Sequence, residues 1–165
     1  MVGLPRVVRS GFLLSWGGMI WLLSDNQLPV TGDGDWSPLL GNFAHGPLFG
    51  FLGLFAIAWL VSAKGERGVE SVWQRIRPSH LIGGILLVLV YGVIDEWHQS
   101  MTPGRVPSLG DVLTDVLGAT AVAATIAHLD PSGANGRRLW WLFALAVAAL
   151  LLSASTADWL PFPGV

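Results

Sequence analysis

The sequence predicts an all-α integral membrane protein, a bundle of about five transmembrane helices with its N-terminus inside and its C-terminus outside. Three observations lead to this prediction. The 165 residues are 52% hydrophobic and only 12% charged, about half the charge of an ordinary soluble domain. The apolar residues form stretches long enough to cross a bilayer. The Lys and Arg residues gather almost entirely at one end of those stretches.

Five apolar stretches each come close to the roughly 20 residues that span a bilayer as a helix. Arg6 and Arg9 precede the first stretch, as in a signal peptide, but no small-x-small cleavage site follows it. We therefore interpret it as an uncleaved helix, and we expect one membrane domain over residues 1–165. The expected helices run over about 7–24, 43–63, 80–98, 109–129 and 139–157.

The loop charges predict the orientation. When the chain is threaded through five spans, only Arg105 of the nine Lys and Arg residues falls on one side of the membrane. The positive-inside rule places the other eight, and the N-terminus, in the cytoplasm. The basic segment 64–79 lies on that side, either as a solvated loop or as a short helix against anionic lipid. The eight residues are Arg6, Arg9, Lys64, Arg67, Arg75, Arg77, Arg137 and Arg138.

Composition also excludes several classes of function. The chain has no cysteine, which excludes disulfides, thiolate nucleophiles and cysteine-based zinc sites. A net charge of −2 gives no reason to expect a nucleic-acid partner, so the lipid bilayer is the expected environment. Nothing in the sequence indicates the oligomeric state or an evident cofactor.

Polar residues that are distant in the sequence should meet at one membrane face. The second helix begins there, the third ends there and the fourth begins there. A membrane protein that buries ionisable groups commonly does so at a functional site. The predicted ligand-binding residues are His45, Asp95, Glu96, Gln99, Arg105, Asp111 and Asp115, and the candidate catalytic residues are Asp95, Glu96 and His98.

The acidic residues of the fourth helix have different explanations. Ser108-x-x-Asp111 has the form of a capping box, which would explain Asp111 without any further role. Asp115 lies one turn deeper, roughly 6 Å along the same helical face, where capping no longer applies. Asp115 is therefore expected to face the interior of the bundle or a wet cavity.

Asp95 and Glu96 stand near the carboxyl end of the third helix, where the helix dipole opposes negative charge. Arg105 is the only basic residue on that side, apart from histidines, and the turn 102–105 would fold it back over the helix. We therefore expect an ion pair between Arg105 and these acids, with Glu96 as the favoured partner. The pair would serve either as a structural clamp or as the anion anchor of a site.

Histidines and glycines at this face have structural alternatives. His45 and His98 would act in a site or simply hydrogen-bond neighbouring groups. Gly46, Gly50 and Gly53 are typical of a helix-packing surface, and Gly118 would let another helix approach closely.

These residues resemble the signature of the VanZ-like family of bacterial membrane proteins, which is named for a teicoplanin-resistance protein. Its pattern is Asp-Glu-x-x-Gln, a Pro-Gly-Arg turn, and Ser-x-x-Asp opening a helix that carries a Gly. Asn42-Phe-Ala-His45 matches a second, shorter signature, and the resemblance spans roughly residues 40–128. The matching residues of the longer pattern are Asp95, Glu96, Gln99, Pro103, Gly104, Arg105, Ser108, Asp111 and Gly118.

The resemblance implies a multi-pass protein of the bacterial cytoplasmic (inner) membrane that acts in the cell envelope and has a link to glycopeptide antibiotic resistance. It supplies no reaction. Two departures make this chain more acidic than the family pattern. The family usually has Asn where Asp115 stands, and a Lys that is usual near His45 is missing.

Three functions fit these observations. In the first, the outward site recognises or modulates a lipid-linked cell-wall precursor or a glycopeptide. In the second, the protein is a membrane hydrolase or transferase that acts on a lipid head group, with Asp95 or Glu96 as base and His98 or His45 as acid. In the third, the carboxylates bind a divalent cation, which relieves their mutual repulsion.

Overall fold

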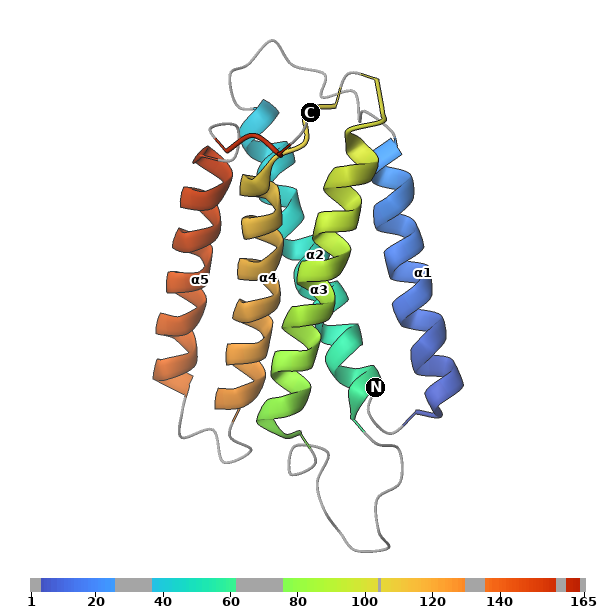
Figure 1. Ribbon diagram of the computed structural model, residues 1–165. Helices are drawn as coiled ribbons and strands as arrows, with labels where there is room; N and C mark the ends of the chain where they lie inside the picture. The colour runs from blue at the N-terminus through green and yellow to red at the C-terminus, as the bar shows by residue number, and fades with distance from the viewer. Residues whose placement is uncertain are drawn as a thin grey trace, which may run out of the picture.

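Within the part of the chain that it describes, the computed structural model contains five α-helices, which run alternately up and down in chain order (Figure 1). The structure describes residues 4–25, 37–61, 76–103, 105–129, 136–156 and 160–163. Residues 64–75 of the predicted basic segment 64–79 lie outside these ranges, as does Gly104. The all-α prediction is confirmed. The helices are α1 (Arg6–Asp25), α2 (Ser37–Leu60), α3 (Pro78–Gln99), α4 (Leu109–His128) and α5 (Gly136–Thr156).

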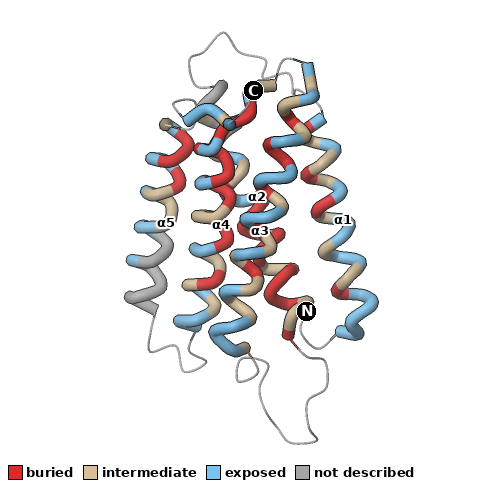
Figure 2. The backbone as a smooth tube through the Cα atoms, in the orientation of Figure 1, coloured by how far each residue is buried: buried red, intermediate tan, exposed pale blue. Residues whose placement is uncertain are grey.

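Four of these helices are long and apolar enough to cross a membrane, namely Arg6–Asp25, Gly41–Leu60, Pro78–Gln99 and Leu109–His128. Helix α5 adds a shorter apolar stretch, Ala144–Thr156. Exposed residues lie along the outer sides of the helices and buried residues where the helices face one another (Figure 2). Many of the exposed side chains are large and apolar, such as Leu14 and Leu152. Such a surface suits contact with lipid.

Local sequence signals set the helix boundaries. Helix α3 begins at Pro78, because proline's fixed φ suits the first turn and its missing N–H costs no hydrogen bond there. Helix α4 begins after Ser108, whose Oγ accepts a hydrogen bond from the backbone N–H of Gly110 at 2.9 Å. Ser108 is therefore the N-cap of α4, which confirms the Ser108 half of the predicted capping box. Helix α2 begins at Ser37, several residues before the expected start at 43, and continues through Pro47.

Helix α2 lies at the centre of the bundle and packs against all four other helices, most extensively against α4. Glycines make the α2–α4 approach close. A Cβ added to Gly118 would stand 2.1 Å from the carbonyl oxygen of Gly46, and one added to Gly50 would stand 3.3 Å from that of Gly118. The predicted glycine packing surface is thus present at this crossing.

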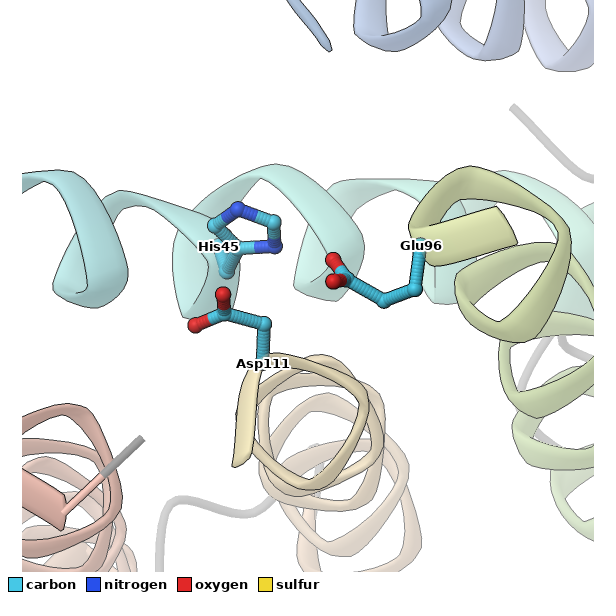
Figure 3. A group of neighbouring side chains, drawn as sticks. All are labelled: His45, Glu96 and Asp111. Carbon is cyan, nitrogen blue, oxygen red and sulfur yellow. The ribbon is translucent and has the colours of Figure 1, made fainter. Parts of the chain in front are cut away.

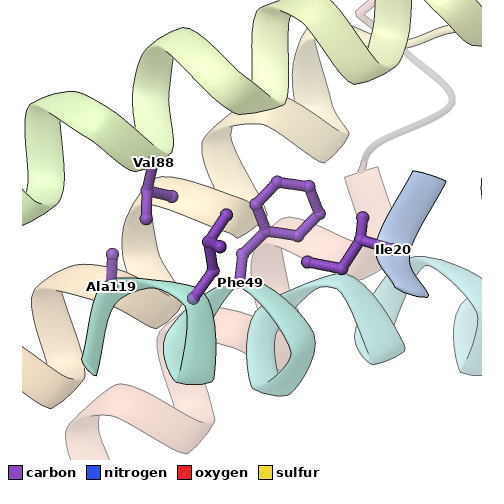
Figure 4. Packing of buried hydrophobic residues seen from close by; sticks show 5 residues of the cluster. Ile20, Phe49, Val88 and Ala119 are labelled. Atoms are coloured by element: carbon purple, nitrogen blue, oxygen red, sulfur yellow. The ribbon is translucent and has the colours of Figure 1, made fainter. Parts of the chain in front are cut away.

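The apolar core lies between α1, α2, α3 and α4 (Figure 4). Its buried members are Ile20, Phe49, Leu52, Val88 and Ala119. Phe49 stands one helical turn from His45 on α2, and their rings stack with centroids 5.7 Å apart. The apolar core therefore packs directly against His45.

Arg9 links two helices at the end of the bundle where α1 begins and α2 ends. Its side chain is buried, and its guanidinium donates to the carbonyl oxygens of Ala58 and Val61 at the carboxyl end of α2. A cation is favoured there because the helix dipole leaves that end negative. Arg9 thereby ties the start of α1 to the end of α2.

Candidate functional site

One end of the bundle gathers a buried polar cluster. The ends of α1 and α3 meet there with the beginnings of α2 and α4 (Figure 1). The side chains of Asp95, Glu96 and Asp115 are 0% exposed, and Asp111 is 6% exposed. Burying four carboxylates in an apolar bundle is costly unless each finds hydrogen bonds or a positive charge.

The centre of the cluster is a group that we call the triad, made of His45, Glu96 and Asp111. These side chains come from α2, α3 and α4 and point toward one another (Figure 3). One nitrogen or oxygen atom of each lies within 4.8 Å of the others. His45 is partly exposed, whereas Glu96 and Asp111 are buried.

Asp115 supports His45 from one turn deeper in α4. Its Oδ1 lies 3.0 Å from Nδ1 of the imidazole. Its Oδ2 is buried and has no hydrogen-bond partner in the part of the chain that the structure describes. A Cβ added to Gly92 would stand 2.7 Å from that Oδ2, so the glycine leaves room on α3 for the carboxylate.

Glu96 is held by two neutral donors. The backbone N–H of Ser108 donates to Oε2 at 2.6 Å, and Nε2 of Gln99 donates to Oε1 at 3.1 Å. Gln99 also donates to Oδ2 of Asp95 at 2.8 Å. Gln99 therefore links the two acids of α3 and helps to orient Glu96 toward His45 and Asp111.

Asp95 and His98 face α1. The hydroxyl of Ser24 donates to Oδ1 of Asp95 at 2.6 Å. The His98 ring stacks on Trp21 with centroids 3.8 Å apart, and its Nε2 lies 3.4 Å from Oδ1 of Asp25. The candidate catalytic residue His98 thus has its observed contacts with α1 and not with the triad.

The predicted ion pair between Arg105 and Glu96 is wrong. The Nε of Arg105 donates to the carbonyl oxygen of Ser24 at 3.1 Å, and Nη2 donates to that of Leu23 at 3.4 Å. The turn forms as expected, closed by the N–H of Arg105 on the carbonyl of Thr102 at 3.1 Å. The guanidinium binds the carboxyl end of α1, whose carbonyls are unsatisfied and whose dipole is negative.

A short C-terminal segment covers the loop before α4. The N–H of Leu109 and the hydroxyl of Ser108 both donate to the carbonyl of Leu160, at 2.8 and 3.1 Å. The N–H of Phe162 donates to the carbonyl of Pro107 at 3.3 Å. These bonds fix the residue whose N–H holds Glu96.

The comparison with protein families decides what kind of protein this is. The VanZ/LLP1 family model matches residues 8–129, about three-quarters of the chain. The chain belongs to the VanZ/LLP1 family. It is thus a multi-pass membrane protein of that family. No curated protein and no solved structure matches it.

The family match in this VanZ/LLP1 protein covers α1 to α4 and contains every predicted site residue. It also contains residues that the sequence analysis missed, above all Ser24, Trp21 and Asp25 on α1. The polar pair Ser24-Asp25 directly follows the first apolar stretch and was the available signal for them. Chemically, the triad offers one imidazole and two carboxylates, groups that hold cations or transfer protons.

Proposed function

We propose that this VanZ/LLP1 protein recognises or modulates a charged cell-envelope or lipid-linked precursor at the polar end of its bundle. The observation that carries the proposal is the convergence of His45, Glu96 and Asp111 from three helices at one end of an otherwise apolar bundle. A site at the end of membrane-spanning helices lies at the level of lipid head groups. Polar groups there recognise the charged part of a molecule whose tail stays in the membrane.

The distribution of charge supports an outward-facing site. When the chain is threaded through five spans, eight of the nine Lys and Arg residues fall at the other end of the bundle. The positive-inside rule assigns that end to the cytoplasm. The whole chain would act as one domain in the bacterial cytoplasmic membrane, with the triad open to the outer leaflet. Lipid-linked wall precursors and glycopeptides both act on that side, and altered handling of either would change antibiotic resistance.

Binding in nanodiscs tests the proposal. Native mass spectrometry would compare retention of a polyprenyl diphosphate-linked sugar with retention of phosphatidylglycerol. We expect the wild type to retain the precursor selectively, and Glu96→Gln and Asp111→Asn to lose it. Thr125→Ala is the control, because Thr125 is exposed on α4 and bonds only its own helix. Equal retention of both lipids, or unchanged retention by the triad variants, would refute precursor recognition.

The His45–Asp115 hydrogen bond favours a second candidate, a hydrolase or transferase that acts on a lipid head group. A carboxylate that orients a histidine is a common arrangement in general acid–base catalysis. Turnover of the bound precursor by the wild type, abolished in His45→Gln with binding retained, would distinguish the enzyme from a binding protein.

A further inference from the structure

We infer that His45, Glu96 and Asp111 bind one divalent cation of the class that accepts both imidazole nitrogen and carboxylate oxygen, such as Mn²⁺ or Zn²⁺. One ligand-type atom of each residue lies within 4.8 Å of the others, and the three residues come from three different helices. Mixed imidazole and carboxylate ligation is typical of these ions. Two further observations distinguish the triad from an ordinary acidic surface.

The first observation is the balance of charge around the triad. Among the described residues, the buried carboxylates of Asp95, Glu96 and Asp115 have no Lys or Arg nitrogen within ion-pair distance, and the ion pair that one of them makes is His45–Asp115. Arg105, the basic residue that the sequence assigns to this end, binds carbonyl oxygens of α1 instead. A divalent cation would supply the missing positive charge.

The second observation is the unpartnered oxygen of Asp115. The carboxylate is 0% exposed, and its Oδ2 makes no hydrogen bond within the described ranges. This oxygen lies against Gly92, about one helical turn before Glu96 on α3, so it lies about one turn deeper than the triad residue of that helix. Its other oxygen holds the His45 ring, and a metal-binding histidine is commonly oriented by a carboxylate in this way.

The ligand side chains are already oriented. Glu96 receives hydrogen bonds from Ser108 and Gln99, and a carboxylate oxygen that accepts one hydrogen bond keeps a lone pair for a metal. Ligand atoms with bonds of about 2.1 Å to a tetrahedrally coordinated ion stand about 3.4 Å apart. The three atoms, which lie within 4.8 Å of one another, therefore need to draw together by at most about 1.4 Å to bind the ion.

Three protein ligands leave coordination positions open, which is typical of sites where the metal also binds a substrate or water. Towards the exposed edge of His45, an open position would accept a phosphate oxygen of a head group. This last role, binding a phosphate of the head group, rests on the proposed function. The cation would be needed for it, because the carboxylates alone would repel a phosphate. The cation site itself is independent of that function.

Metal binding by the purified full-length chain tests the inference without any phosphorylated lipid. After dialysis against EDTA in a neutral detergent, Mn²⁺ would be titrated and its free fraction followed by electron paramagnetic resonance, with Zn²⁺ competition as a second measurement. We expect one saturable site. His45→Gln, Glu96→Gln and Asp111→Asn should each weaken binding by more than about 100-fold, and Asp115→Asn by about 10-fold, because outer partners matter less than ligands.

His128→Gln is the matched control, since His128 lies on α4 at the opposite end of the bundle, and its affinity should equal that of the wild type. Mn²⁺ should also raise the unfolding temperature of the wild type, a measurement that does not depend on whether a variant folds. No saturable binding and no thermal shift would overturn the inference, as would binding that His45→Gln and Glu96→Gln leave intact. Precursor retention in EDTA would refute only the role of the cation in binding the head group, whereas Mn²⁺ binding without precursor retention would refute the proposed function alone.

Discussion

The imidazole of His45 and the carboxylate of Asp115 are 70 residues apart in the chain, yet Nδ1 and Oδ1 lie 3.0 Å apart. Asp115 is fully buried, and His45 supplies the hydrogen bond observed on its carboxylate. This contact joins α2 to α4 next to their glycine crossing. Its loss would leave a buried carboxylate beside an apolar core.

We predict strong coupling between His45 and Asp115. His45→Ala should lower the free energy of unfolding by about 3–5 kcal/mol, because it strands a buried charge. Asp115→Ala should cost less, since the imidazole is 15% exposed and can reach water. The double variant should therefore be more stable than the sum of the two losses implies, by about 0.5–3 kcal/mol. SDS titration in mixed micelles, followed by tryptophan fluorescence, measures the free energy of unfolding of the wild type, the two single variants and the double variant. If the losses of the two single variants simply add up in the double variant, the pair is not coupled.

Arg105 is predicted to act as a clasp between the α3–α4 turn and α1. Arg105→Ala removes two charged hydrogen bonds to Ser24 and Leu23, and it should lower the free energy of unfolding by about 2–4 kcal/mol. Arg105→Lys should recover part of that loss, because it keeps a cation at the negative end of α1 but donates with different geometry. The same SDS titration gives both values.

Precursor binding distinguishes this clasp from an anion anchor. In nanodiscs at low temperature, where the variants stay folded, Arg105→Ala should retain the precursor as well as the wild type does. Lost binding with unchanged stability would contradict the clasp and return Arg105 to the anchor role that the sequence suggested.

The fold was predictable because lipid imposes strong constraints on sequence. Every helix that crosses a bilayer must be apolar over about 20 residues, and alternate threading then determines which helix ends meet. That argument alone predicted that His45 would meet the α3–α4 hairpin, as the structure shows. The ligand roles of the gathered residues stay predictions.

Lateral neighbours were not predictable in the same way. Threading places the end of α1 at the polar face but does not say that α1 packs beside α3. The contacts of Ser24 with Asp95 and of Trp21 with His98 depend on that packing. The error on Arg105 has the same origin, because its turn allowed the side chain to reach either α3 or the neighbouring α1.

The glycine crossing predicts a steric penalty at Gly118. Gly118→Ala places a methyl group 2.1 Å from the carbonyl oxygen of Gly46, and backbone atoms cannot move aside cheaply. We expect a loss of about 1–3 kcal/mol or more in the free energy of unfolding. Gly18→Ala is the control, because a Cβ there meets nothing within 4 Å, and it should be neutral or slightly stabilising. Equal effects of the two substitutions would mean that α2 and α4 do not cross this closely.

Membrane orientation is the last prediction, and the chain is well suited to testing it because it contains no cysteine. Met101 is 58% exposed in the turn after α3, and Leu129 is 37% exposed just after α4 at the opposite end. With the N-terminus in the cytoplasm, Met101→Cys should react with a membrane-impermeant maleimide on intact cells. Leu129→Cys should react only after permeabilisation. The reverse pattern would place the triad in the cytoplasm, where an outer-leaflet precursor cannot reach it, and the proposed function would fail while the cation site would stand.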